Sequence, residues 1–205
     1  MALKRMIKNM LMFPRQINIW RKSRGFQKNA ICDDGIKFGI KSSCHNETGR
    51  KDALYIGAHC EIDAIIAIQS EGYIRIGDHS TIRYGSVVGA VEGVEIGSHV
   101  IISNNVHIYD NNNHPTSPKV RWEMCNQGFY GDAWKWKHAS AKKIVIEDGV
   151  WIGERATILK GVTIGKGSII GCDAVVTHNI PQYCIAAGNP AKVVKRLEAE
   201  LDAET

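Results

Sequence analysis

Histidine is the residue type in this sequence best suited to acid–base chemistry, and its eight copies differ in their setting. His59, His79 and His99 recur at a fixed interval of twenty residues, which indicates a repeated structural position. His114 precedes a proline and stands where a regular repeat gives way to a long irregular segment. Because the unperturbed pKa of imidazole lies near neutral pH, a histidine could serve as the general base that deprotonates a hydroxyl. His138, late in the same segment, is the alternative base.

The sequence lacks the common motifs of covalent, nucleotide-dependent and metal-dependent catalysis. It contains no GxSxG, Walker, GxGxxG or HExxH pattern. None of the six cysteines forms a CxxC pair or stands at zinc-site spacing with histidine, so we expect no metal and reduced thiols. Direct acyl transfer from a thioester to a hydroxyl stays compatible with this inventory, because it needs a base and an N–H group for the oxyanion but no covalent intermediate.

The elements that must position these residues are marked by an aliphatic repeat. The chain has 27 Ile and 14 Val but only 6 Leu, and β-branched side chains favour strands over helices. Aliphatic residues recur at every sixth position, a spacing that neither a helix nor a hairpin strand produces. A chain that turns a corner every six residues produces it, with three hexapeptides in each triangular coil of 18 residues. The spacing predicts an all-β fold of stacked parallel strands in which Ile146 lies beside Ile164.

Three segments resemble a known family. Residues 150–153 (VWIG), 161–165 (GVTIG) and 186–192 (AAGNPAK) are similar to the hexapeptide-repeat acyltransferases, especially galactoside, maltose and polysaccharide O-acetyltransferases. The resemblance implies a left-handed parallel β-helix, a homotrimer with active sites between subunits, acetyl-CoA as co-substrate, and His114 as the catalytic base.

The resemblance also implies binding residues. The acetyl-CoA contacts of the family fall on Glu154, Cys172, Thr177, His178, Lys192 and Lys195. The two lysines could neutralise cofactor phosphate, and the alternative is a solvated basic surface. The acceptor positions fall on Arg83, where galactoside enzymes carry asparagine, and on Asn105.

The domain organisation follows from charge and from breaks in the repeat. Residues 1–30 form an arm with eight basic residues and no acidic one, residues 31–180 the β-helix, and residues 181–205 a C-terminal loop and short helix over Val193–Leu201. The repeat is interrupted by a loop at 110–143 that holds three of the five tryptophans and could be a subunit-packing arm, a site wall or both. The rest of the chain carries a net charge of −3, so we do not expect nucleic-acid binding.

The arm carries an amphipathic stripe that we expect to end at Pro14. This helix could contact an anionic membrane surface or pack on the end of the prism. The stripe consists of Leu3, Met6, Ile7, Met10 and Leu11.

We therefore expect a cytoplasmic, trimeric, acetyl-CoA-dependent O-acetyltransferase. Its acceptor would be a sugar or glycan hydroxyl in surface-polysaccharide or lipopolysaccharide synthesis. One alternative is a drug acetyltransferase of the chloramphenicol or streptogramin kind, and another is a non-catalytic trimeric scaffold.

Overall fold

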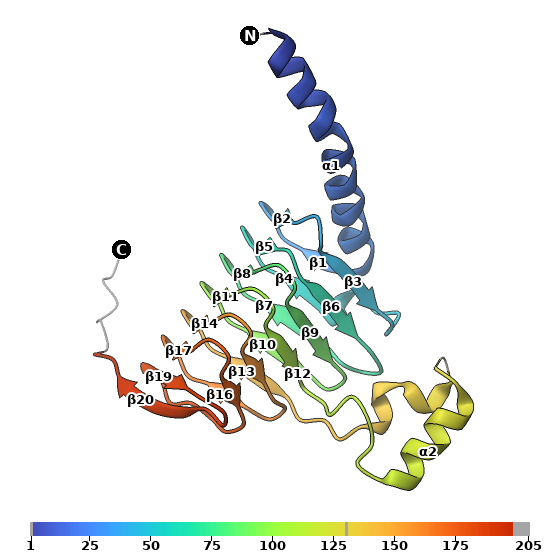
Figure 1. The fold of residues 1–205 in the computed structure, drawn as a ribbon, viewed down its shortest axis with the longest axis vertical. Helices are drawn as coiled ribbons and strands as arrows, with labels where there is room; N and C mark the ends of the chain where they lie inside the picture. Colours follow the sequence, from blue (N-terminus) through green and yellow to red (C-terminus); the bar gives the residue numbers. More distant parts are fainter. Residues whose placement is uncertain (1, 130, 199–205) are drawn as a thin grey trace.

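The computed structural model describes residues 2–129 and 131–198, with only the backbone for residues 2–15. After helix α1 (Ala2–Asn29), the described chain winds into a stack of coils with three walls of short strands (Figure 1). The first wall, sheet A, contains β1 (Ile31–Cys32), β4 (Leu54–Ile56), β7 (Ile74–Ile76), β10 (Val94–Ile96), β13 (Ile144–Ile146) and β16 (Thr163–Ile164). Sheet B contains β2 (Lys37–Phe38), β5 (Glu61–Ile62), β8 (Thr81–Ile82), β11 (Ile101–Ile102), β14 (Trp151–Ile152), β17 (Ile169–Ile170), β19 (Cys184–Ala187) and β20 (Lys192–Arg196). Sheet C contains β3 (Ser43–Asn46), β6 (Ile65–Ile68), β9 (Val87–Ala90), β12 (His107–Tyr109), β15 (Thr157–Ile158) and β18 (Val175–Val176).

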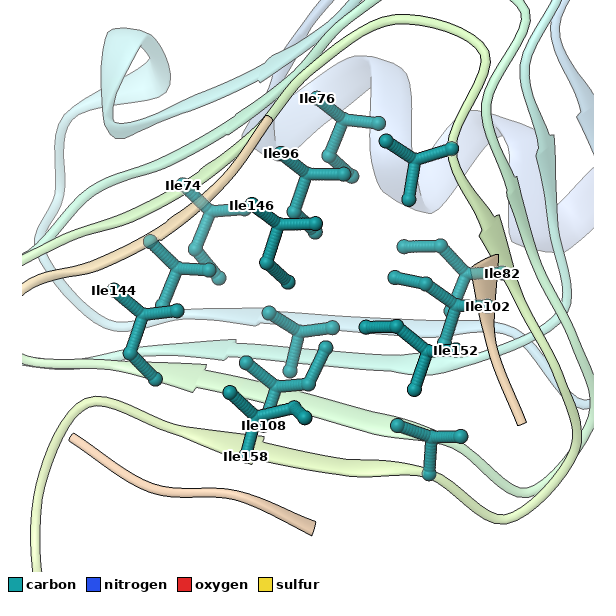
Figure 2. Close-up of a cluster of buried hydrophobic side chains, with 14 of the residues drawn as sticks. Ile74, Ile76, Ile82, Ile96, Ile102, Ile108, Ile144, Ile146, Ile152 and Ile158 are labelled. Atoms are coloured by element: carbon teal, nitrogen blue, oxygen red, sulfur yellow. The ribbon is translucent and has the colours of Figure 1, made fainter. Parts of the chain in front are cut away.

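The aliphatic rows of the sequence form the core of this prism. Ile146 pairs in parallel register with Ile164, as the six-residue spacing predicts. The twenty-residue coils behave in the same way, since Ile56, Ile76 and Ile96 pair in succession. Figure 2 shows isoleucines from the three walls pointing into one interior, and the isoleucines labelled there are buried. The predicted parallel β-helix is confirmed.

The repeated histidines occupy one corner, between sheets A and B. His59, His79 and His99 adopt φ values of 58°, 57° and 58°, in the left-handed region. Their rings stack with centroid separations of 5.0 and 5.1 Å. Histidine is among the non-glycine residues enriched in this region. The prediction that these residues hold a repeated corner is confirmed.

Helix α1 corrects the expectation that Pro14 ends the first helix, because the helix continues to Asn29. A proline removes one backbone hydrogen bond, but the residues after it form helical turns that pack on the first coil. Phe26 is buried there and its ring stacks on Phe38 at 4.3 Å between centroids. The side chains of the amphipathic stripe lie outside the described residues. The remainder of α1 extends away from the prism (Figure 1), and no described helix combines the length and apolarity needed to cross a membrane.

The C-terminal segment corrects a second expectation. We expected a short helix from Val193, but Lys192–Arg196 form strand β20, which pairs antiparallel with β19. The open edge of β19 offers hydrogen-bonding partners, and the adjacent β-branched Val193 and Val194 suit a strand. The end of the predicted helix, residues 199–201, lies outside the described residues. β19 itself extends sheet B beyond residue 180.

The predicted loop leaves the prism after β12 and returns at β13. It contains helix α2 (Pro118–Gln127) and two short 3-10 segments, Asp132–Trp134 and Trp136–His138. Figure 1 shows it standing out from the corner where sheet C ends, beside the middle coils of the prism.

Candidate active site

The start of the loop is fixed by a buried carboxylate. Asp110 is fully buried and accepts hydrogen bonds from the backbone N–H groups of Val91, Glu92 and Gly93 at 2.7–3.0 Å. The side-chain amide of Asn111 donates a further bond at 3.0 Å. Burial of a carboxylate is costly unless it is hydrogen-bonded, and these four donors satisfy it. The Asp110 side chain therefore ties the first residue of the loop to the coil beneath it.

A tight turn then presents His114. The backbone N–H of Asn113 donates to the Asn111 side-chain oxygen at 2.7 Å, and the N–H of His114 donates to the Asn112 carbonyl at 2.6 Å. Asn113 has a φ of 60°, a conformation that asparagine tolerates better than most residues. The His114 side chain is exposed at the end of this turn. The asparagine run thus sets where the imidazole projects.

His114 lines a pocket of about 530 Å³ between the loop and sheet C. This volume is within the range typical of small-molecule sites. The imidazole meets the Trp134 ring edge to face at 5.5 Å between centroids. Further side chains that line the pocket come from the loop and from three coils of the prism: Glu47, Gln69, Tyr109, Asn113, Phe129, Lys135 and Trp136.

Trp136 holds the loop against the prism through a ring contact and a backbone hydrogen bond. Its ring meets the Tyr109 ring at 5.6 Å and 88°, and its backbone N–H donates to the side-chain oxygen of Gln69 at 2.9 Å. Gly89 lies beneath these rings, where a Cβ atom would come within 2.6 Å of Tyr109 and 3.0 Å of Trp136. Burial raises the pKa of the Tyr109 phenol, so its hydroxyl stays protonated at neutral pH. The loop therefore forms one wall of the pocket, which is one of the two roles the sequence left open.

The alternative base, His138, is engaged elsewhere. Its Nε2 atom lies 3.0 Å from Asp132, whose carboxylate also contacts Lys137 at 2.9 Å and Lys135 at 3.2 Å. Lys137 first, then His138 and Lys135, hold the pKa of Asp132 well below its usual range. His138 does not line the pocket around His114.

The six positions expected to bind acetyl-CoA lie on three separate parts of one chain. Glu154 and Cys172 occupy the corner between sheets B and C, whereas Thr177 and His178 follow β18 at the other end of sheet C. The Thr177 hydroxyl and His178 Nδ1 are 2.8 Å apart. Lys192 and Lys195 lie exposed on β20.

An ion pair stiffens the corner that carries Glu154 and Cys172. The Arg155 guanidinium donates two hydrogen bonds to Asp173, at 2.7 and 2.8 Å. This contact raises the pKa of Arg155 and lowers that of Asp173. Both residues adopt positive φ, so the pair joins two successive corners of the prism.

The two expected acceptor residues are not brought to the His114 pocket within one chain. Arg83 lines a separate depression of about 230 Å³ on sheet B. Asn105 occupies the corner between sheets B and C with a φ of 57°. Any role beside His114 would require the corner of a second chain.

Sequence reasoning missed two features of the site. Asp110 was part of the loop but carried no motif that marks a buried carboxylate. Glu47 and Gln69 stand 22 residues apart at the ends of successive sheet C strands, and that interval is the only signal that they are neighbours. Their place in the pocket depends on where the loop folds.

Two segments of the chain match models of known repeat families. Residues 143–178 match the bacterial transferase hexapeptide with its six repeats, and residues 73–110 match the hexapeptide repeat of succinyl-transferase. A protein of Schizosaccharomyces pombe named as an acetyltransferase is 34% identical over 140 residues, which cover 68% of this chain and 61% of that protein. Escherichia coli WbbJ, named as a lipopolysaccharide biosynthesis O-acetyl transferase, is 31% identical over 129 residues, which cover 63% of each protein. The chain thus spans about three-fifths of the length of these curated relatives.

A solved structure shares the fold. The crystal structure of a hexapeptide-repeat acetyltransferase from Vibrio cholerae, complexed with acetyl-coenzyme A, superposes with a TM-score of 0.53 and 27% identity. The match covers 77% of this chain and 72% of that one. The prism is therefore a left-handed parallel β-helix. Two segments of the chain therefore carry the hexapeptide repeat of bacterial transferases.

Proposed function

We propose that this protein is an acetyl-CoA-dependent O-acetyltransferase that acetylates a sugar hydroxyl. The observation that carries the proposal is His114, an exposed imidazole held by an anchored turn at the edge of an aromatic pocket. The likeness to an acetyltransferase complexed with acetyl-coenzyme A supports the donor, and the likeness to WbbJ supports a glycan acceptor.

In the proposed reaction, a ring nitrogen of His114 takes the proton of the acceptor hydroxyl as its oxygen attacks the thioester carbonyl. A backbone N–H group stabilises the negative oxygen of the tetrahedral intermediate. When the carbon–sulfur bond breaks, the imidazolium returns the proton to the departing CoA thiolate. The products are the acetyl ester and free CoA, and no enzyme atom is acylated.

The residues proposed to hold acetyl-CoA fit such a ligand in chemistry. Lys192 and Lys195 are exposed cations on one strand, suited to phosphate, while Glu154 and Cys172 offer backbone groups at a corner. Since these residues and His114 lie on different parts of one chain, a cleft that uses them together needs a second copy. We therefore include a homotrimer in the proposal. Light scattering should give a mass near three times 22.7 kDa, whereas a monomer mass would contradict it.

The proposal is tested with acetyl-CoA and a panel of sugar nucleotides, oligosaccharides and antibiotics. Thiol release together with the mass of the product identifies both the donor and the acceptor. Acetylation of an antibiotic but of no sugar would favour a drug acetyltransferase. Acetyl-CoA that neither binds nor turns over would favour a scaffold.

The basic arm suggests that the protein meets its acceptor at a membrane surface. The described part of α1 exposes Trp20, with the Arg24 guanidinium 5.2 Å from its ring centroid, and the first 30 residues carry no acidic group. Basic residues with an interfacial tryptophan suit an anionic membrane surface. We include peripheral contact with such a surface in the proposal.

A further inference from the structure

The walls of the pocket beside His114 combine aromatic rings with charged side chains. This combination restricts the kinds of sugar that the pocket can accept. Trp134, Trp136 and Phe129 line it from the loop. Aromatic rings present broad apolar surfaces, against which the C–H face of a pyranose can pack. The polar groups that reach the pocket then decide which sugar is accepted.

The lysine that lines the pocket is engaged in an ion pair. Lys135 lies 3.2 Å from the Asp132 carboxylate, which lies between Lys135, Lys137 and His138. The Lys135 ammonium is therefore paired with a carboxylate that is not among the residues lining the pocket.

The anionic side chain that lines the pocket is not neutralised. Glu47 follows β3, and its backbone N–H donates to the Ile68 carbonyl at 2.9 Å, which fixes it beside Gln69 at the corner. Its exposed carboxylate has no hydrogen-bond or ion-pair partner among residues 2–129 and 131–198. The side-chain oxygen of Asn113, at the His114 end, is buried and likewise without a partner within the described chain. Both groups accept hydrogen bonds and donate none.

We propose that Glu47 sets the charge of the acceptor: the pocket takes a sugar unit that is uncharged or carries an amino group, and it rejects one that carries a carboxylate. Hydroxyl and ammonium groups supply the donors that Glu47 lacks. A uronic or sialic acid would bring a second carboxylate into a partly enclosed pocket, where like charges are costly. This inference rests on the proposed sugar acceptor but concerns binding, so it can be tested without turnover.

The test compares two probes of nearly the same shape, 4-nitrophenyl β-glucuronide and the corresponding glucuronamide. Their binding to the 205-residue chain is measured by NMR titration at constant pH and low salt. We expect the uncharged amide to bind at least about tenfold more tightly than the carboxylate, the scale of one close like-charge contact in a partly exposed site. The preference should shrink as salt is raised.

Two variants test whether Glu47 causes the preference for the uncharged probe. Glu47→Gln keeps the shape of the side chain and removes its charge, so the preference for the amide should be lost. Glu71→Gln is the matched control: it removes a carboxylate that is 92% exposed and outside the pocket, and the preference should remain. Equal binding of both probes to the parent, an unchanged preference in Glu47→Gln, or binding of neither probe would each overturn the inference. Failure of the proposed acetyltransferase activity would appear separately, as absent turnover of acetyl-CoA with every acceptor.

Discussion

Replacing Asp110 by alanine should both destabilise the protein and loosen the turn that presents His114. The carboxylate accepts three backbone N–H bonds and one amide bond while fully buried. The Gly93 N–H is buried and would lose its partner, at a cost of about 1.5–3 kcal/mol for a bond to a charged group. Glu92 is exposed and Val91 is half-buried, so their N–H groups regain water and lose less.

The sum is a loss of about 4 kcal/mol, which corresponds to a fall in melting temperature on the order of 10 °C for a chain of this length. Thermal denaturation followed by circular dichroism, at one protein concentration for all variants, measures it. If Asp110→Ala does not fold, Asp110→Asn supplies the measurement, because it is isosteric but turns an N–H₂ group towards some of the donors. Turnover should fall in either variant, since His114 lies only four residues further along.

Asp148→Ala is the control for this prediction. Asp148 also accepts a backbone N–H, from Ser98 at 2.7 Å, but it lies exposed at a corner away from the loop. Its loss should shift the melting temperature less and leave turnover unchanged. If Asp110→Ala melts within about 2 °C of the parent, the buried carboxylate does not anchor the loop and the reasoning is refuted.

Three further predictions concern catalysis, the cofactor surface and the arm. His114→Ala should lower kcat by roughly 10²–10⁴ and leave the Kd of acetyl-CoA nearly unchanged, because a general base acts in the transition state and not in cofactor binding. Near-parent turnover would exclude His114 as the base. Iodoacetamide at pH 8 should label the exposed Cys125 and Cys172 but not Cys44, because burial raises the pKa of Cys44 to about 11 and so disfavours its reactive thiolate. CoA should slow labelling of Cys172 alone, and equal slowing at Cys125 would argue against the proposed cofactor surface. Deleting residues 1–12 should weaken sedimentation with anionic vesicles more than it reduces turnover of a soluble acceptor, and unchanged sedimentation would leave only the packing role of α1.

The site was only partly accessible from sequence. His114 was assigned by resemblance, and its position at the break in the repeat, which the order of residues along the chain determines, agreed with that assignment. Cys172 and Lys195 were assigned by resemblance alone, and whether they share one ligand depends on a second chain. Glu47 carries no motif at all, since a lone glutamate at a corner is ordinary until a loop folds over it.

The sequence by itself determined the prism. A row of aliphatic residues at a spacing of six is a local constraint, because each corner is made within its own hexapeptide, and stacking then follows from burial of the row, as Ile146 on Ile164 shows. Only the tertiary structure decided where the loop rests. The backbone N–H of Trp136 donates to Gln69, which is 67 residues away in sequence. The Trp136 ring packs over Gly89, where any side chain would clash with it. The same holds for β20, where the open edge of β19 outweighs the local helical pattern, because an unpaired strand edge is satisfied only by a segment that the fold brings beside it.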